Sequence, residues 1–231
     1  KCSVTSDPTD SANWSLESGI NASTFGDETD AVVFDDLLLI SRSQDILSWN
    51  ETADDDDWWT NTISGTALEA NYPHTMHVHR GGAETLFVTD ANLVRYYNTS
   101  AGHSDVTLGE DQIAICVTSG VDAVGVGTYS AGSDSAYVYE IHVGEVSSNT
   151  SVARNAFKVD GRAVLSIEVL DNIPYIITDK GNLQAFSGAG FKTIKRLPFA
   201  GNSTVLDGVR IGDVNDKNNR RPVHPKGMRS D

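Results

Sequence analysis

Four acidic residues followed by two tryptophans form the most chemically suggestive segment of the sequence, in the stretch ETADDDDWW. Asp56 and Asp57 stand next to Trp58 and Trp59. Indole rings offer flat apolar faces on which a sugar can stack, and neighbouring carboxylates accept hydrogen bonds from hydroxyl groups or bind Ca²⁺. The segment therefore predicts a binding site for a glycan or for Ca²⁺. The alternative is a solvated acidic loop whose tryptophan pair packs against the neighbouring part of the fold.

Three histidines lie close together in the stretch HTMHVHR. On a β-strand, His77 and His79 would share one face, with His74 just upstream. Two histidines at this spacing can chelate a metal ion when a third ligand comes from elsewhere. No carboxylate is placed by spacing to complete such a site, so the sequence favours a partly exposed strand over a metal centre.

A second acidic segment, GDVNDKNN, resembles a Ca²⁺ loop without completing one. It lacks the glycine and the closing glutamate that the Ca²⁺ loop of an EF-hand requires, so an ordinary connecting loop is favoured. We expect no resident cofactor, and Ca²⁺ is the ion that the acidic segments would bind. The oxygen ligands on offer are Asp213, Asn215, Asp216 and Asn218.

The motifs of common catalytic sites do not occur in the sequence. It holds no Gly-x-Ser-x-Gly elbow, no His-Glu-x-x-His and no phosphate loop. No catalytic residue is therefore assigned, and the sequence favours a protein that is not an enzyme.

The charge of the chain is strongly acidic. Lys and Arg number 17 against 32 Asp and Glu in 231 residues, which gives a formal net charge of -15. Such a surface repels nucleic acid and anionic membranes, and no apolar run reaches the length of a membrane span. Nucleic acid and membrane insertion are therefore excluded as expected partners.

Six Asn-x-Ser/Thr triplets favour an exposed, extracellular surface. Asn50 and Asn98 belong to a repeat described below, so turn formation is the alternative for these two. The remaining four are the candidate glycosylation sites: Asn13, Asn21, Asn149 and Asn202.

Two cysteines are too few for a disulfide framework. Cys116 lies in the apolar run QIAICVTS and is expected to be a buried free thiol. A bond between Cys116 and Cys2 is the alternative.

The elements that must position these residues are repeated along the chain. The segment LLISRSQDILSWN (residues 38–50) aligns without a gap with LFVTDANLVRYYN (residues 86–98). Residues 175–186 fit the same frame, and residues 124–141 form a looser copy with a longer turn. The copies lie about 40 to 50 residues apart, which is the period of a repeat architecture.

Each copy predicts three or four antiparallel strands joined by short turns. An apolar strand precedes every copy, and Asp, Asn or Gly stands at the turn between the two strands, as tight hairpins require. Several apolar runs are continuous rather than alternating, which is typical of strands covered on both faces. A single unit of this kind cannot bury both faces and must stack on its neighbours.

This pattern resembles the β-propeller superfamily, of the WD40, kelch and related type, in blade pattern without any one family's signature. The resemblance implies an all-β fold, a β-propeller of antiparallel three- to four-stranded blades in an incomplete ring. A β-sandwich or an irregular β-solenoid is the alternative. The expected division is an N-terminal extension or blade-completing strand at 1–29, about four blades at 30–200, and a loop with the start of a further blade at 201–231.

The acidity and degenerate repeats are similar in style to propeller modules in structural proteins of tailed viruses and in secreted adhesins. This resemblance implies a structural or recognition module of a virion (tail, fibre or decoration) or of a cell surface, extracellular or on the virion. Its expected partners are copies of itself, other structural subunits and a glycan. The alternatives are a carbohydrate-active enzyme, a glycoside hydrolase or lyase, on a propeller scaffold, and an intracellular scaffold of WD-repeat type. An enzyme predicts carboxylates converging at the central channel, whereas an assembly module predicts an uncovered apolar patch.

Overall fold

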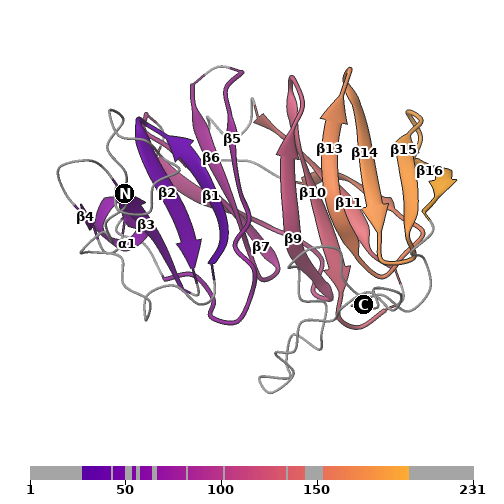
Figure 1. The fold of residues 1–231 in the computed structure, drawn as a ribbon, viewed down its shortest axis with the longest axis horizontal. Helices are drawn as coiled ribbons and strands as arrows, with labels where there is room; N and C mark the ends of the chain where they lie inside the picture. The colour runs from indigo at the N-terminus through magenta and orange to yellow at the C-terminus, as the bar shows by residue number, and fades with distance from the viewer. Residues whose placement is uncertain are drawn as a thin grey trace, which may run out of the picture.

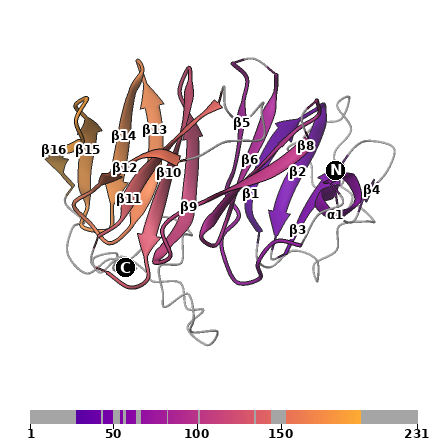
Figure 2. The same ribbon diagram turned by 180° about the vertical axis from the view of Figure 1, so that it is seen from behind.

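Four antiparallel β-sheets stand side by side in chain order (Figure 1). One short helix, α1 (Trp58–Ile63), lies beside the first sheet, as the view from behind also shows (Figure 2). The computed structural model describes residues 28–42, 44–49, 54–55, 58–63, 67–81, 83–100, 102–133, 135–143 and 153–197.

Every sheet is a meander of four strands, so each strand pairs with the next one along the chain. The first sheet is β1 (Glu28–Phe34), β2 (Leu37–Arg42), β3 (Asp45–Trp49) and β4 (Asp54–Asp55); the second is β5 (Met76–His79), β6 (Thr85–Asp90), β7 (Leu93–Asn98) and β8 (Gly102–Thr107). The third is β9 (Gln112–Ser119), β10 (Ala123–Ser130), β11 (Tyr137–His142) and β12 (Ala153–Lys158); the fourth is β13 (Val164–Leu170), β14 (Ile173–Thr178), β15 (Asn182–Phe186) and β16 (Phe191–Arg196).

Tight turns of Asp and Asn set the register of the first hairpin in two of the sheets. Asp35 and Asp36 join β1 to β2 with φ of 49° and 61°, and Asp171 and Asn172 join β13 to β14 with φ of 50° and 62°. Two successive residues at positive φ are the mark of a type I′ hairpin turn, which Asp and Asn tolerate. The predicted strands between residues 30 and 197 and these predicted turns are confirmed. The predicted N-terminal segment (1–29) lies almost wholly, and the predicted start of a further blade (201–231) wholly, outside the described residues.

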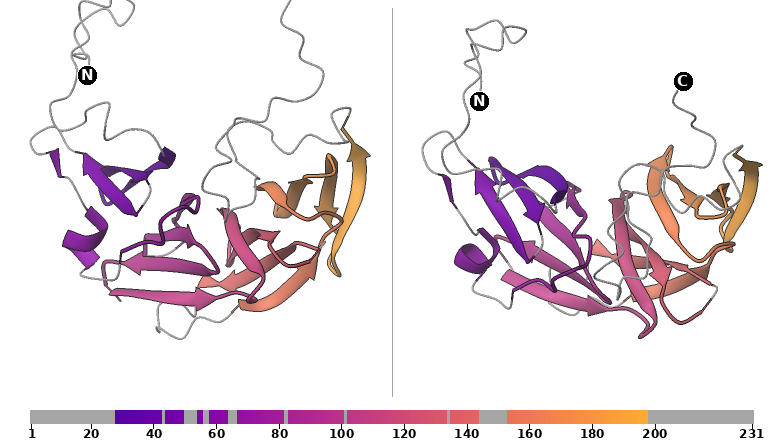
Figure 3. Two further views of the ribbon diagram at one scale, coloured as in Figure 1. Left: turned by 90° about the horizontal axis from the view of Figure 1, so that it is seen from below. Right: turned by 60° about the horizontal axis from the view of Figure 1, so that its bottom comes forward.

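The four sheets are arranged as an open arc (Figure 3). The first strands of successive sheets, β1, β5, β9 and β13, contact one another along the inside of the arc. The last strands of the sheets lie toward its outside, and the first and fourth sheets stand apart at the two ends (Figure 3).

The hydrophobic core lies between the sheets rather than within any one of them. A cluster that includes Phe34, Leu39 and Leu86 joins the first sheet to the second. A second cluster around Phe87 and Val126 joins the second sheet to the third, and two further clusters join the third to the fourth. Each sheet thus depends on its neighbour for burial, as expected for stacked blades.

Radially stacked four-stranded meanders define a β-propeller fold. The predicted fold class is therefore confirmed, with four blades in the described residues.

Candidate functional site

The tryptophan pair predicted to bind a ligand lies in the core. Only 5% of Trp58 and 1% of Trp59 is exposed, and both belong to the cluster between the first two sheets. The ring of Trp58 meets Phe34 and Tyr97 edge-on, with centroids 6.0 Å and 5.6 Å apart. The structure therefore places the two rings as the packing alternative describes, with no face left open for a sugar.

Several predicted site residues lie outside the described residues, so their roles remain predictions. Asp56 and Asp57 are two of them, although the preceding acids, Asp54–Asp55, form the edge strand β4. The others are the glycosylation candidates Asn13, Asn21, Asn149 and Asn202, the repeat residue Asn50, the loop residues Asp213, Asn215, Asp216 and Asn218, and Cys2.

Two of the three histidines have separate protein partners. Nδ1 of His74 donates to the carbonyl oxygen of Thr89 at 2.8 Å, and Nε2 of His77 lies 2.8 Å from Oγ of Ser119 on β9. Burial lowers the pKa of both His77 and His79. Within the described residues, no group of three or more His, Cys, Asp or Glu side chains is arranged to hold a metal ion.

The His77–Ser119 contact has the spacing of a base and a nucleophile. Catalysis would also need a group that orients the imidazole. Asp30, the carboxylate that raises the pKa of His77, directs its oxygens to the backbone N–H groups of Ala31 and Met76, each at 2.8 Å. We therefore interpret the contact as a link between neighbouring blades.

The acidic residue at the end of the second strand of a blade has a structural role. Asp90 is fully buried; it accepts from Arg95 Nε at 2.6 Å and from the Glu69 backbone N–H at 2.8 Å. Asp179 occupies the same place in the fourth sheet and accepts from the backbone N–H of Arg162 at 2.9 Å. These two carboxylates fasten the loops that enter the second and the fourth blade.

Two further predicted residues have defined surroundings. Asn98 is 3% exposed, and its amide donates to the Glu84 carbonyl at 3.2 Å and accepts from Ser100 N–H at 2.8 Å, as a turn residue would. Cys116 is a free cysteine, as expected, and burial raises the pKa of its thiol to about 12. Such a thiol is chemically inert.

The first sheet presents an apolar face at its end of the arc. Cross-strand partners share a face, so Ala31, Ile40 and Leu47 lie in one row and Val33 pairs with Leu38 in the next. None of these five residues belongs to the core clusters among the described residues. Val33 is 53% exposed, whereas Leu47 is buried, with 8% of it exposed. We call this the β1 end face.

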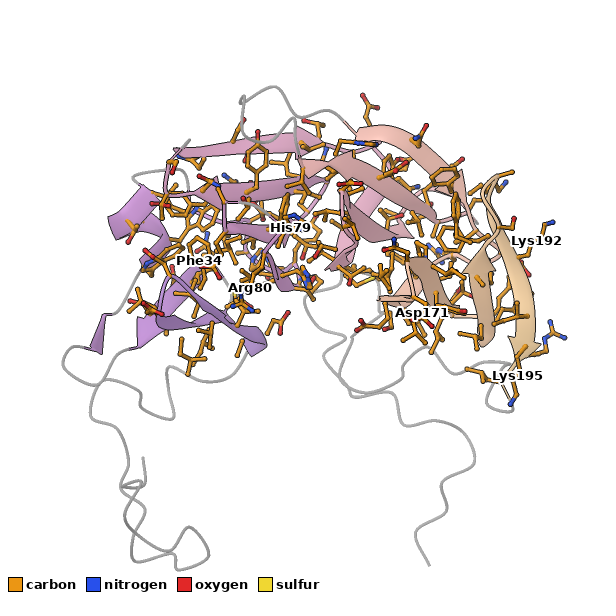
Figure 4. All side chains as sticks on the ribbon, turned by 90° about the horizontal axis from the view of Figure 1, so that it is seen from above. Phe34, His79, Arg80, Asp171, Lys192 and Lys195 are labelled. Carbon is orange, nitrogen blue, oxygen red and sulfur yellow. The ribbon has the colours of Figure 1, made fainter. Side chains whose placement is uncertain are left out.

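The fourth sheet presents a second apolar face at the opposite end. Leu170 pairs with Ile173 there, and they are 63% and 40% exposed. The neighbouring rows are Glu168, Tyr175, Ala185 and Lys192, and Ser166, Ile177, Leu183 and Lys195. We call this the β16 end face; Lys192 and Lys195 stand at the far end of the arc (Figure 4).

Exposed large apolar side chains are concentrated on the two end sheets. Of the five in the described residues, Val33 lies in the first sheet, and Leu170, Ile173 and Ile194 lie in the fourth; Val121 is at the β9–β10 turn. Leu170 and Ile173 are cross-strand partners, and neighbouring exposed apolar side chains of this kind are suited to an interaction site.

A cleft of about 360 Å³ opens between the third and fourth sheets. Three phenylalanines line it, with ring centroids 4.9 Å apart for Phe157 and Phe186 and 5.4 Å for Phe186 and Phe191. Glu140 and His142, 3.5 Å apart, supply polar groups at its wall. An apolar cleft with a few polar groups is suited to binding a small ligand.

Sequence reasoning did not identify either end face or this cleft. The three phenylalanines come from three strands of two sheets, so no local motif joins them. The continuous apolar run Leu37 to Ile40 was a signal for the β1 end face, because it indicates a strand with two apolar faces. The sequence does not show which of these two faces packs against the second sheet, because that depends on how the blades are arranged.

The comparisons with known proteins support the fold. No protein-family model and no curated protein matches the sequence. The chain is similar to the propeller-like virginiamycin B lyase from Staphylococcus aureus, with a TM-score of 0.51 and 12% identity over 74% of this chain and 56% of that one. It is also similar to AztD from Citrobacter koseri, with a TM-score of 0.49 and 12% identity over 73% of this chain and 46% of that one. The chain thus spans about half the length of these two proteins, and the likeness concerns the fold. No helix in the described part of the chain is long and apolar enough to cross a membrane.

Proposed function

We propose that this chain is a non-enzymatic structural module of a virion or cell surface that works within an assembly and attaches through the ends of its arc. The observation that carries the proposal is the exposure, among the described residues, of Val33 on the first sheet and of Leu170 and Ile173 on the fourth. Blades of a propeller bury such faces against a neighbouring blade. A face exposed at the end of the arc is therefore suited to a partner in an assembly.

The cleft between the third and fourth sheets is the best candidate for the recognition part of this function. Its phenylalanine rings offer apolar surface for the carbon–hydrogen face of a sugar, and Glu140 and His142 offer hydrogen-bonding groups beside them. A glycan array comparing the wild-type chain with Phe186→Ala tests this part. Signals that the substitution abolishes support glycan recognition in the cleft; signals that persist in the variant place it elsewhere.

Association of the purified chain tests the assembly role. We expect multi-angle light scattering to give a mass above the 24.8 kDa of one chain, rising with concentration. Val33→Glu should lower that mass, because it places a charge on a face that must be desolvated on association.

Val121→Glu is the matched control, since Val121 is 61% exposed but lies on neither end face. It should leave the association of the wild-type chain unchanged. A wild-type chain that remains at the mass of one copy up to concentrations on the order of 100 µM would contradict self-assembly of appreciable affinity.

A further inference from the structure

We infer that the cleft between the third and fourth sheets binds an amino sugar, whose protonated amino group contacts the carboxylate of Glu140 while its ring packs on a phenylalanine cluster. This cluster consists of Phe157, Phe186 and Phe191. The inference rests on the glycan recognition proposed for the cleft and specifies the class of sugar. The charge of the lining distinguishes this class from neutral and acidic sugars.

The facing sides of two neighbouring blades bring the carboxylate and the rings together. β11 pairs with β12 so that Val138 lies beside Phe157 and Glu140 lies beside Asn155. Val138 and Glu140 are two residues apart on β11, so both rows occupy one face of the third sheet. That face lines the cleft, and Phe186 lines it from the fourth sheet.

The phenylalanine cluster offers one apolar surface to a ligand. The ring centroids are 4.9 Å apart for Phe157 and Phe186, 5.4 Å for Phe186 and Phe191, and 6.5 Å for Phe157 and Phe191. All three side chains are partly exposed, in contrast to the buried tryptophan pair. Aromatic faces pack against the carbon–hydrogen face of a sugar ring, and their negative charge density attracts a cation.

The charged side chains of the cleft favour a cation. Asp122 and Glu140 supply two carboxylates, and His142 is the basic residue beside them. No Lys or Arg occurs among the residues that line the cleft, all of which the structure describes. The net charge of -15 on the whole chain acts in the same direction. A ligand with an ammonium group is therefore attracted, whereas a sugar with a carboxylate or a sulfate is repelled.

Glu140 can accept an ammonium group without losing its present partner. Its Oε2 accepts a hydrogen bond from Asn155 Nδ2 at 2.7 Å, and its Oε1 lies 3.5 Å from His142 Nε2. The Glu140 side chain is 33% exposed, so a ligand can reach it. Each carboxylate oxygen can accept two hydrogen bonds, and a bond from an ammonium group is charge-assisted and therefore stronger than a neutral one.

Titration calorimetry with two matched trisaccharides tests the inference. The trisaccharides of glucosamine and of N-acetylglucosamine share their rings and linkages, but acetylation removes the positive charge of the amino groups. At pH 6 these amino groups are protonated, and about 150 mM salt screens distant charges. We expect the full chain to bind the glucosamine trisaccharide at least about tenfold more tightly, because only its amino groups can form charged hydrogen bonds to Glu140.

Two variants assign this preference to the cleft. Glu140→Gln keeps a side-chain oxygen for Asn155 but removes the charge, so it should lose most of the preference for the glucosamine trisaccharide. Glu168→Gln is the matched control, because Glu168 is exposed on the β16 end face, outside the cleft, and the net charge changes equally. Phe186→Ala should weaken binding of both trisaccharides. The comparison of the two ligands itself needs no variant, so it stands if a substituted chain fails to fold.

The other outcomes overturn the inference in distinguishable ways. Equal affinity for both trisaccharides, abolished by Phe186→Ala, would overturn the selection of a charged sugar while glycan recognition in the cleft stands. Equal losses in Glu140→Gln and Glu168→Gln would show attraction by the overall charge alone. A chain that binds a trimethyllysine peptide but neither trisaccharide would have a site for a protein amine. If no glycan binds, glycan recognition fails with the inference, whereas the assembly role is tested separately by light scattering.

Discussion

At the scale of single residues, buried polar groups fasten the loop that enters the second blade to the strands of that blade. Asp90 has no exposure and Arg95 has 7%, and their charged groups are 2.6 Å apart. His74, also without exposure, lies beside them with Nδ1 3.8 Å from Asp90 Oδ1. The ion pair of Asp90 and Arg95 stabilises the fold only when both residues are present, because either charge alone would be buried without a partner of opposite sign.

Removal of the Asp90 carboxylate should therefore be costly. We expect Asp90→Ala to lower the free energy of unfolding by about 3 to 5 kcal/mol, because Arg95 and the Glu69 N–H lose their acceptor. Chemical denaturation measures this change. Lys180→Ala removes the exposed ion pair with Asp160 and should cost less than about 1 kcal/mol. Equal costs for the two would contradict the structural role of Asp90.

The pH dependence of stability should report His77 and His79. Their pKa values are lowered in the folded chain, first because burial disfavours the imidazolium, with His79 adding to the shift at His77 and Asp122 opposing the shift at His79. Between those lowered values and about 6.5, the unfolded chain binds more protons than the folded one. Stability is therefore complete above about pH 6.5 and is lost as the pH falls through the lowered folded pKa values.

Denaturation of His77→Gln tests this expectation. Gln can keep the hydrogen bond to Ser119 but cannot take up a proton, so the variant should lose less stability than the wild-type chain between about pH 7.5 and pH 5.5. His103→Gln, at an exposed position on β8, is the control. If the free energy of unfolding of His77→Gln changed with pH as steeply as that of the wild-type chain, His77 would not be a source of the pH dependence.

At the scale of elements, close approach of neighbouring sheets depends on small residues. Gly127 on β10 faces the fourth sheet, and a Cβ added there would lie 2.5 Å from Cys116 Sγ and 2.6 Å from Val164 Cγ1. A Cβ at Gly120, at the end of β9, would come no closer than 3.7 Å to its neighbours. Alanine at Gly127 therefore tests the packing between the two sheets, and alanine at Gly120 measures the general effect of replacing a glycine.

We expect Gly127→Ala to lower the free energy of unfolding by roughly 1 to 3 kcal/mol, because the two sheets must shift to accept the methyl group. Gly120→Ala should stay within about 0.5 kcal/mol of the wild-type chain. Thermal and chemical denaturation of both variants measure the difference. A neutral Gly127→Ala would show that the third and fourth sheets are less closely packed than described.

The strands and hairpin turns of this protein are well predicted from its sequence because each depends on residues that are close together in the chain. The hairpin turns follow from Asp35, Asp36, Asp171 and Asn172, and the strands follow from the apolar runs that flank them. The site is less predictable because burial and stacking are not local. Trp58 and Trp59 stand beside a run of acids in sequence, yet their rings are buried between two sheets.

At the scale of the whole molecule, the arc has two unlike ends. At one end Val33 is exposed, and at the other Leu170 and Ile173 are exposed on a sheet whose outer strand carries Lys192 and Lys195. A partner in an assembly that binds at either end would cover apolar side chains that no other described residue covers.

Small-angle X-ray scattering of the wild-type chain, measured as it elutes from a size-exclusion column, tests this account most directly. The account predicts a mass above that of one chain and a maximum distance larger than one arc spans, and it predicts that Leu170→Glu lowers both toward those of a single arc. A mass of one chain for the wild-type protein, with a distance distribution that Leu170→Glu leaves unchanged, would contradict it.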